Sequence, residues 1–300
     1  MISAALSHIL SEHISTESHQ RFTLQHCQPI SGGSINNSYK ISGNDKHYFL
    51  KTNNTDCSKM FAAEAKGLKC ITDSNTVLTP KPICYGETND NTYLVMDYLE
   101  LGSVYEQSEQ HSIYQLGEQL AAMHHCIETT YGWEIDNTIG STPQMNTKND
   151  SWLEFYREQR LGYQINLASN NGHHGRIIDN VQKLNEHLDQ LLSHNPPASL
   201  LHGDLWSGNY GVTDSGAPAI FDPAVYYGDR ETDIAMTELF GGFPPRFYDA
   251  YWHHYPKEAE YYVRKTLYNL YHILNHLNLF GEGYYSQADH MVSALLSEVR

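Results

Sequence analysis

Short apolar runs separated by polar turns occupy most of the first hundred residues. Runs of this length with flanking turn residues are typical of strands. The strands are predicted over residues 22–30, 38–41, 48–50, 83–85 and 92–96. Between the third and fourth runs, Phe61, Ala65 and Leu68 recur at the spacing of one helix face, which predicts a helix over 59–71. The first part of the chain is therefore expected to be a sheet with one helix.

The pattern changes to helical spacing after Leu99. Helices are predicted over residues 113–123, 152–167, 177–192 and 263–277. In the last of these, Val263 and Leu267 begin a stripe with alternating spacings of four and three, which indicates an amphipathic helix packed on a core. The stripe has too few heptads to favour a coiled coil. We therefore predict an α+β, bilobal chain, with a small strand-rich N-terminal lobe over 1–98 and a larger, mostly helical lobe over 99–300.

The composition agrees with two lobes that fold without disulfide bonds or structural metal ions. The chain has 300 residues, and 40% of them are hydrophobic, which is enough for a sizeable core. Lys and Arg number 19 against 35 Asp and Glu, so the formal charge is −16. That charge repels nucleic acid and anionic membrane surfaces, so we expect neither as a partner. It does not exclude phosphate ligands, which one Lys, backbone N–H groups and metal ions hold locally.

Targeting signals and metal-binding patterns are not recognisable in the sequence. The chain has no apolar run of about 18 residues, and residues 1–14 lack the Lys and Arg of a signal peptide. Its five cysteines are widely spaced without a C-x-x-C pair, which predicts reduced thiols. The adjacent pairs 124–125, 173–174 and 253–254 are histidines, but neighbours on a helix point in different directions and chelate poorly. We expect a cytoplasmic monomer.

The segment from Leu201 to Asn209, L-H-G-D-L-W-S-G-N, carries the candidate chemistry. Phosphoryl transfer from ATP needs a carboxylate that accepts the proton of the attacking hydroxyl, and oxygen ligands that hold Mg²⁺. Asp204 and Asn209 have the H-x-D-x-x-x-x-N spacing of the protein-kinase catalytic loop. A hairpin-like stretch then leads to Asp222, which supplies another carboxylate at the end of a predicted strand.

A lysine and a glutamate earlier in the chain complete this set. Lys51 ends a predicted strand and Glu64 lies on the following helix. Such a Lys neutralises the α- and β-phosphates when a Glu fixes it. Each residue alone has a plainer explanation: a turn for Asp204, a strand edge for Lys51 and a solvated helix face for Glu64. Together with Asn209 and Asp222 they fill every required role, which favours a kinase.

Further candidate contacts lie in two segments and at one aromatic residue. The candidate nucleotide contacts are Gly32, Gly33, Ser34, Met96, Asp97, Tyr98 and Leu99. The small residues let the backbone approach a phosphate, although a hairpin turn explains them equally well. Residues 96–99 join the predicted lobes and could present backbone groups to an adenine edge. They could equally be the end of a buried strand that is followed by polar residues. Trp206, two residues after Asp204, is either a packing residue or an aromatic face for a sugar ring.

These residues resemble the fructosamine kinase, or ketosamine-3-kinase, family. This family belongs to the aminoglycoside-phosphotransferase-like branch of the protein-kinase-like fold. The resemblance rests on the catalytic loop at 202–209 and on F-D-P-A at 221–224. The F-G-G-F-P segment at 240–244 and the late helix from 268 to 281 add to it. It extends over most of the chain, from 32 to 281.

The resemblance implies a bilobal protein-kinase-like fold, ATP as the phosphate donor and Mg²⁺ as a cofactor. It implies phosphorylation of the C3 hydroxyl of a sugar joined to an amine by an Amadori linkage. The 3-phosphate ester is unstable and sheds the sugar, so the family is regarded as a deglycation system. By position, the resemblance implies Asp204 as the base, Asn209 and Asp222 as Mg²⁺ ligands, Lys51 and Glu64 with Gly32, Gly33 and Ser34 at the phosphates, Met96, Asp97, Tyr98 and Leu99 at adenine, and Trp206 and His202 at the substrate.

Two other functions stay open at this point. The first is a kinase of the same fold that acts on an aminoglycoside, choline or another hydroxyl; Trp206 and the F-G-G-F-P segment favour a ketosamine instead. The second is a non-catalytic nucleotide-binding protein, which would be expected to have lost Asp204, Asn209, Asp222 or Lys51. All four are present. Some family members carry Cys in the phosphate loop where this chain has Ser, so redox control through that loop is not implied.

Overall fold

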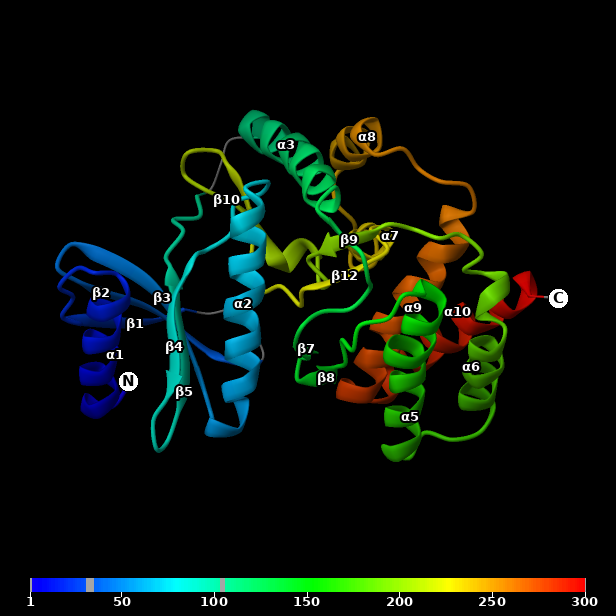
Figure 1. Cartoon of the computed structure of the whole chain (residues 1–300), viewed down its shortest axis with the longest axis horizontal. Helices are drawn as coiled ribbons and strands as arrows, with labels where there is room; N and C mark the ends of the chain where they lie inside the picture. The colour runs from blue at the N-terminus through cyan, green and yellow to red at the C-terminus, as the bar shows by residue number, and fades with distance from the viewer. Residues whose placement is uncertain (1, 31–34, 103–105, 300) are drawn as a thin grey trace. The chain divides into compact units, whose positions relative to one another are not determined.

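The computed structural model describes residues 2–30, 35–102 and 106–299, which form two compact units. The first unit consists of Met1–Ser112 and Gly211–Asp222, and the second of Ile113–Tyr210 and Pro223–Arg300. Strands dominate the first unit and helices dominate the second (Figure 1). The predicted α+β class is therefore confirmed.

The first unit is built on a five-stranded antiparallel sheet with the strand order β1-β2-β3-β5-β4. Its strands are β1 (His26–Ile30), β2 (Asn37–Gly43), β3 (Lys46–Asn53), β4 (Pro82–Glu87) and β5 (Thr92–Asp97). Asn44 and Asp45 join β2 to β3 with φ angles of 52° and 60°, as a two-residue hairpin turn requires. Each predicted strand overlaps one of these, but residues 22–25 precede β1.

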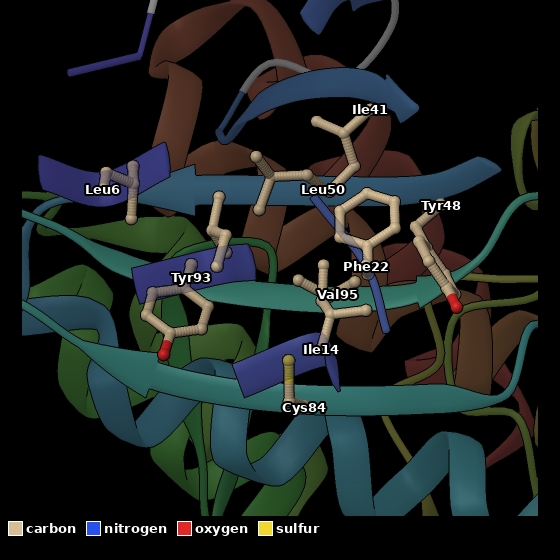
Figure 2. Close-up of a cluster of buried hydrophobic side chains, with 10 residues drawn as sticks. Leu6, Ile14, Phe22, Ile41, Tyr48, Leu50, Cys84, Tyr93 and Val95 are labelled. Atoms are coloured by element: carbon tan, nitrogen blue, oxygen red, sulfur yellow. The ribbon is translucent and has the colours of Figure 1, made fainter. Parts of the chain in front are cut away.

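Two helices cover opposite faces of this sheet. They are α1 (Ala4–Glu17) and α2 (Ser58–Ser74), the second preceded by the 3₁₀ turn η1 (Thr55–Cys57). Tyr93 and Val95 of β5 pack against residues of α1 (Figure 2). Leu94 and Met96, which point to the other face, pack against α2. The predicted helix over 59–71 is thus confirmed as α2, whereas α1 was not predicted.

A hairpin from later in the chain completes the first unit. β10 (Tyr210–Val212) pairs with β11 (Pro218–Ile220). The N–H of Ile220 donates to the carbonyl oxygen of Leu78 at 3.0 Å, which ties β11 to the segment between α2 and β4. This attachment brings Asp222, at the end of the hairpin, to the first unit.

The second unit is arranged around one long helix, α9, which packs against α5, α7 and α10. Its helices are α4 (Trp152–Tyr156), α5 (Tyr163–Asn170), α6 (Arg176–Glu186), α7 (Glu231–Thr237), α8 (Pro245–His254), α9 (Tyr261–Phe280) and α10 (Tyr285–Glu298), and α3 (Glu106–His124) leads into it. Short turns lie at η3 (Leu188–Gln190), η4 (Ser207–Asn209) and η5 (Glu282–Tyr284). Its strands are β6 (Ile127–Glu128), β7 (Asn137–Ile139), β8 (Thr142–Gln144), β9 (Ala198–Leu201) and β12 (Tyr226–Gly228). They form one sheet of order β12-β9-β6 and a β7-β8 hairpin.

The predicted helix over 152–167 contains an irregularity. Between α4 and α5 the backbone forms the π-helical segment η2 (Arg157–Gly162). Arg160 in this segment is fully buried. Its guanidinium donates to the carbonyl oxygen of Met145 and lies 4.0 Å from the ring centre of Tyr226. No helix within residues 2–30, 35–102 and 106–299 is both long and apolar enough to cross a membrane.

A buried histidine in α9 predicts acid sensitivity of the second unit. Burial lowers the pKa of His272 from its usual value to about 3. Between that value and the unfolded pKa of about 6.5, the unfolded chain binds one proton more than the folded chain. The free energy of unfolding is therefore unaffected by this histidine above pH 6.5. Below pH 6.5 it falls by about 1.4 kcal/mol per pH unit, because the unfolded chain takes up the proton. We expect His272→Asn to flatten the dependence of the unfolding free energy on pH between 6 and 5 by that amount.

Urea unfolding at several pH values, followed by tryptophan fluorescence, measures this slope. His290, an exposed histidine in α10, provides the control, because its replacement by Asn should leave the slope unchanged. Equal slopes for the wild type and His272→Asn would contradict the prediction.

Candidate active site

Lys51 meets two carboxylates within the first unit. It lies in β3, Glu64 lies in α2, and Asp222 follows β11. Lys51 Nζ donates to Glu64 Oε1 at 2.6 Å and to Asp222 Oδ1 at 2.7 Å. The side chains of Lys51 and Glu64 are nearly buried, whereas that of Asp222 is 45% exposed. Three residues that are far apart in the sequence are therefore in direct contact.

The two carboxylates keep the Lys51 ammonium charged. Burial alone would lower the pKa of Lys51, but the charges of Asp222 and Glu64 outweigh burial and raise it above the usual value. Burial raises the pKa of Glu64, and the Lys51 ammonium opposes that rise. A fixed positive charge beside a half-exposed carboxylate suits the binding of a phosphate group and its metal ion.

The loop that follows β9 in the second unit holds Asp204. The N–H of Asp204 donates to His202 Nδ1 at 3.2 Å. The amide of Asn209 donates from Nδ2 to the backbone oxygen of Asp204 at 2.8 Å and to its Oδ2 at 3.2 Å. The 3₁₀ turn η4 supplies the bend that returns Asn209 toward Asp204. The H-x-D-x-x-x-x-N spacing therefore forms a closed, hydrogen-bonded loop that orients a carboxylate.

Asn209 and Asp222 each keep one oxygen without a hydrogen bond from any described residue. Asp222 Oδ1 accepts from Lys51, which leaves Oδ2. Asn209 uses Nδ2 toward Asp204, which leaves its amide oxygen Oδ1. Carboxylate and amide oxygens are ligands that Mg²⁺ accepts. Each residue, taken within its own unit, therefore fits the role of a magnesium ligand.

The carboxylate of Asp233 binds the backbone of the loop that carries Asp204. Its Oδ2 accepts from the N–H of His202 at 2.7 Å, and its Oδ1 accepts from the N–H of Gly203 at 2.8 Å. His124 Nε2 also contacts Oδ2, at 3.1 Å, while His124 Nδ1 lies 2.7 Å from the Tyr251 hydroxyl. All these groups are buried. Burial would raise the pKa of Asp233, but the bonds from His124 and the loop lower it, so the carboxylate stays ionised.

Sequence reasoning missed Asp233 and His124. Asp233 lies in α7, all of whose residues are buried. The run D-R-E-T-D at 229–233 was a usable signal, because several charges beside an apolar segment need buried partners. The partners themselves come from α3 and from the catalytic loop, and their distance in the sequence conceals the contact.

Replacing Asp233 by Asn is expected to loosen the catalytic loop. The substituted amide can place an oxygen on only one of the two backbone donors, and its NH₂ group faces the other. We expect the free energy of unfolding to fall by about 2–4 kcal/mol, as for other buried charged partners. Because the loop orients Asp204, kcat should fall at least about tenfold with little change in the KM for ATP. Urea unfolding and steady-state kinetics measure both effects.

The control is Asp249→Asn, which changes an exposed aspartate of α8 in the same way. It should affect neither stability nor kcat. Wild-type kcat in the Asp233 variant would mean that other contacts hold the loop.

Gly203 is required by the close approach of another segment. Its φ of 82° favours glycine, and an added Cβ would lie 2.1 Å from the carbonyl oxygen of Ala224. The N–H of Ala224 donates to the carbonyl oxygen of His202 at 2.8 Å. The glycine of H-G-D therefore lets the catalytic loop bond to the segment that follows Asp222. His202, which was predicted to contact the substrate, is fully buried, and its ring accepts the N–H of Asp204 within the loop.

Trp206 presents an aromatic face at the surface of the second unit. Its side chain is 37% exposed. Its ring lies edge-on to Phe240, with ring centres 6.2 Å apart. It also covers Gly208, where an added Cβ would lie 2.3 Å from the indole. The glycine of the W-S-G-N sequence therefore leaves room for the indole ring.

The candidate adenine contacts lie at the end of β5 and directly after it. Met96 is buried in β5, and the N–H of Asp97 donates to the carbonyl oxygen of Lys81 at 2.9 Å. The Lys40 ammonium lies 4.1 Å from the centre of the Tyr98 ring. Leu99 is half-buried. The predicted phosphate-loop residues Gly32, Gly33 and Ser34 lie outside the described residues.

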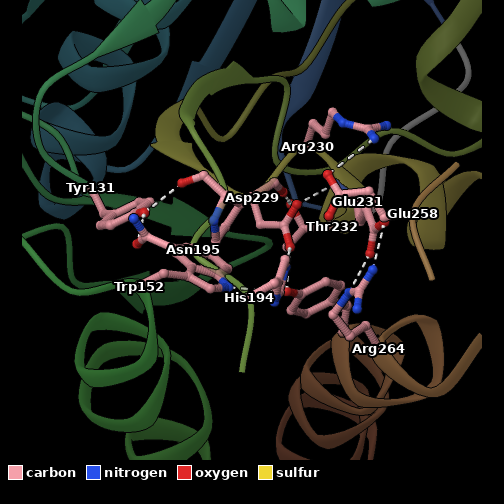
Figure 3. Close-up of polar contacts among 12 residues, drawn as sticks. Tyr131, Trp152, His194, Asn195, Asp229, Arg230, Glu231, Thr232, Glu258 and Arg264 are labelled. Carbon is pink, nitrogen blue, oxygen red and sulfur yellow. Dashed lines mark hydrogen bonds and ion pairs between the residues drawn. The ribbon is translucent and has the colours of Figure 1, made fainter. Parts of the chain in front are cut away.

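A second charged cluster supports α7 and the segment before it (Figure 3). His194, Asp229 and Glu231 lie close enough to hold one ion. Their carboxylates are already paired, however: Asp229 Oδ2 is 2.7 Å from His194 Nε2 and accepts from Tyr268 at 2.5 Å. Glu231 accepts two bonds from Arg264, at 2.6 and 3.0 Å. We interpret this cluster as structural support for α7.

The sequence is similar to one protein family along almost its whole length. Residues 6–298 match the sequence model of the fructosamine kinase family. A probable ketoamine kinase of Synechocystis sp. is 44% identical over 288 residues, which cover 96% of each chain. The chloroplastic protein-ribulosamine 3-kinase of Arabidopsis thaliana is 41% identical over 264 residues, covering 86% of this chain and 79% of that protein.

Solved structures extend the likeness to the fold. A structure described as a fructosamine-3-kinase from Haemophilus somnus superposes with a TM-score of 0.87 at 29% identity and covers 96% of each chain. An aminoglycoside phosphotransferase solved with ADP and hygromycin B has a TM-score of 0.67 at 16% identity, which shows the shared kinase-like fold alone. It covers 98% of this chain and 99% of that one. Because the family match runs from α1 to α10 and includes both groups of site residues, the chain belongs to the fructosamine kinase family.

Proposed function

We propose that this protein transfers the γ-phosphoryl group of ATP to the C3 hydroxyl of a ketosamine. The observation that carries the proposal is the bonding of Asp204 by Asn209 within the H-G-D-L-W-S-G-N loop. Membership of the fructosamine kinase family supports the reaction class, and relatives named ketoamine kinase and protein-ribulosamine 3-kinase support the substrate class. The fold shared with aminoglycoside phosphotransferases supports a hydroxyl as the acceptor.

Asp204 acts as the base in this proposal. Its carboxylate accepts the proton of the sugar hydroxyl as the hydroxyl oxygen bonds to the γ-phosphorus. The bond between that phosphorus and the β,γ-bridging oxygen breaks, and ADP leaves. Asn209 bonds to the carboxylate itself, and the buried His202 accepts the backbone N–H of Asp204, so both hold the residue in place. A fixed carboxylate lowers the entropy cost of reaching the reactive geometry.

Lys51 and the two carboxylates beside it handle the phosphates. Lys51 supplies a permanent positive charge to the α- and β-phosphates, and Glu64 fixes its position. Asn209 and Asp222 would hold Mg²⁺ through their remaining oxygens. Bound Mg²⁺ neutralises charge on the β- and γ-phosphates.

The remaining candidate residues bind the two substrates. The backbone of residues 96–99 would meet the adenine edge, and Gly32, Gly33 and Ser34 are proposed as further phosphate contacts. Trp206 supports the apolar face of the sugar. The product, a 3-phosphate ester, would shed its sugar and so release the amine. A cytoplasmic monomer without a nucleic-acid or membrane partner is part of the same proposal.

The test is Mg²⁺-dependent release of ADP with a panel of acceptors. The panel contains ribulose-lysine, fructose-lysine, choline, kanamycin and free sugars. Turnover with the ketosamines, and none with choline or kanamycin, is the expected result. Turnover with choline or kanamycin alone would mean that the acceptor is not a ketosamine. ATP binding without any turnover would favour a non-catalytic protein.

A further inference from the structure

A row of aromatic rings leads away from Trp206 along the second unit. The Trp206 ring centre is 6.2 Å from that of Phe240, and Phe240 is 5.0 Å from His276. His276 lies 5.5 Å from Phe280 and 5.0 Å from Tyr284. The rings come from the catalytic loop, the segment after α7, helix α9 and the turn η5. We call these five residues the aromatic row.

Part of the aromatic row faces solvent. Trp206 is 37% exposed and Phe280 is 60% exposed, while Phe240, His276 and Tyr284 are half-buried. A ring as exposed as Phe280 adds little to the core. The row also contains more rings than one sugar ring covers, because it begins at the residue proposed to support the sugar and continues through three further ring contacts. It therefore has room for a part of the acceptor beyond the sugar.

His276 gives the row a hydrogen-bond acceptor. Its Nδ1 lies 2.8 Å from the carbonyl oxygen of His272, so Nδ1 carries the proton and donates it. Burial lowers the pKa of His276, so the ring is neutral at pH 7. A neutral ring protonated at Nδ1 has a lone pair on Nε2. Nε2 makes no hydrogen bond to any described residue.

A ketosamine differs from a free ketose at a position that suits this surface. Its C1 carbon is joined to a secondary amine, which is protonated at neutral pH, and the amine carries an alkyl chain such as that of lysine. The ammonium group is both a hydrogen-bond donor and a cation. A bare imidazole nitrogen accepts such a donor, and the face of an aromatic ring attracts such a cation.

We propose that the aromatic row binds the amine side of the acceptor. His276 Nε2 accepts a hydrogen bond from the secondary ammonium beside the face of Phe240, and Phe280 with Tyr284 covers the alkyl chain of the amine. The occupant is thus a ketosamine of a long alkylamine, such as a lysine side chain in a peptide. The inference rests on the proposed function, because it takes the sugar to lie on Trp206.

Phe280→Ala tests the distal end of the row. Two acceptors with the same sugar are compared: ribulose joined to methylamine, and ribulose joined to the side chain of a lysine within a short peptide. The variant should raise the KM for the peptide about three- to tenfold and leave the KM for the methylamine adduct unchanged. Tyr262→Ala is the matched control, because Tyr262 is 64% exposed near the start of the same helix. It should change neither KM.

His276→Phe tests the ammonium contact. It keeps an aromatic ring but removes the acceptor nitrogen, so the KM for both ribulosamines should rise about tenfold. The KM for free ribulose, which lacks the amine, should not change. A purely structural role of His276 would raise all three values or lower kcat alike, and that result would overturn the assignment. Equal KM values for wild type and Phe280→Ala with the peptide would overturn the distal part.

Failure of this inference is distinguishable from failure of the proposed function. If wild-type protein phosphorylates neither ribulosamine while ATP still binds, the proposed function is wrong. If wild type turns over both adducts and the row variants show no selective change, ketosamine kinase activity stands and the amine side binds elsewhere.

Discussion

Asp204→Asn is expected to lower kcat by about 10³-fold or more, because the substituted amide cannot accept the proton of the attacking hydroxyl. General-base catalysis contributes about 10²–10⁴-fold, and positioning by the same carboxylate adds to that. Asn has nearly the size of Asp, and its side-chain oxygen can still accept from Asn209, so the loop should keep its shape. Affinity for ATP, measured by calorimetry, should change less than about threefold. Single-turnover phosphate transfer measures the loss.

Asp189→Asn is the control for this substitution. Asp189 is exposed in η3 of the same unit, and its change should leave kcat at the wild-type value. A kcat within tenfold of wild type in Asp204→Asn would assign the base to another group. Loss of ATP binding in that variant would mean instead that Asp204 acts mainly on the nucleotide.

Local patterns were sufficient where chemistry and secondary structure lie on neighbouring residues. Short apolar runs bounded by polar residues predicted β3 and β5, and one helix face predicted α2. The spacing between Asp204 and Asn209 is also local, because five residues and one 3₁₀ turn fix their distance. The contact of Lys51 with Glu64 follows from a strand that is succeeded by a helix. These features depend on short-range geometry that a sequence displays directly.

Long-range contacts were harder to foresee. The hairpin that ends at Asp222 belongs to the first unit, and contacts with residues far away in the sequence attach it, such as the bond of Ile220 to Leu78. The support of the catalytic loop by Asp233 depends on a packing partner from α3. Helix α1 was missed because its buried Leu6, Leu10 and Ile14 stand among Ser and His residues, which weaken the helical signal.

The aromatic row is a surface feature that also depends on contacts between residues far apart in the sequence. Trp206 was recognisable because it lies two residues from Asp204. His276 and Phe280, further along the row, come some seventy residues later, at positions where an apolar helix face already explains most of the pattern. Only the fold brings their rings together, through α9 and the segment after α7. Contacts of this kind follow from the fold and leave no local pattern in the sequence.

Asp222→Asn is expected to remove most of the metal dependence of nucleotide binding. Asp222 has a φ of 58°, a conformation that Asn adopts with little strain, so the backbone should be preserved. Lys51 keeps its bond to Glu64 in this variant. What is lost is one negative charge and one carboxylate oxygen proposed to hold Mg²⁺. We expect kcat to fall about 10²–10³-fold, because phosphoryl transfer relies on the metal ion to neutralise developing charge.

Calorimetric titration of ADP with and without Mg²⁺ separates this role from a structural one. In wild type, Mg²⁺ should tighten ADP binding, whereas in Asp222→Asn the two affinities should agree within about twofold. Asp214→Asn, which changes an exposed turn residue of the same hairpin, should keep the wild-type difference. An undiminished Mg²⁺ effect in Asp222→Asn would assign the metal to other ligands. Equal loss of affinity with and without Mg²⁺ would show that Asp222 acts through Lys51, whose ammonium it contacts at 2.7 Å.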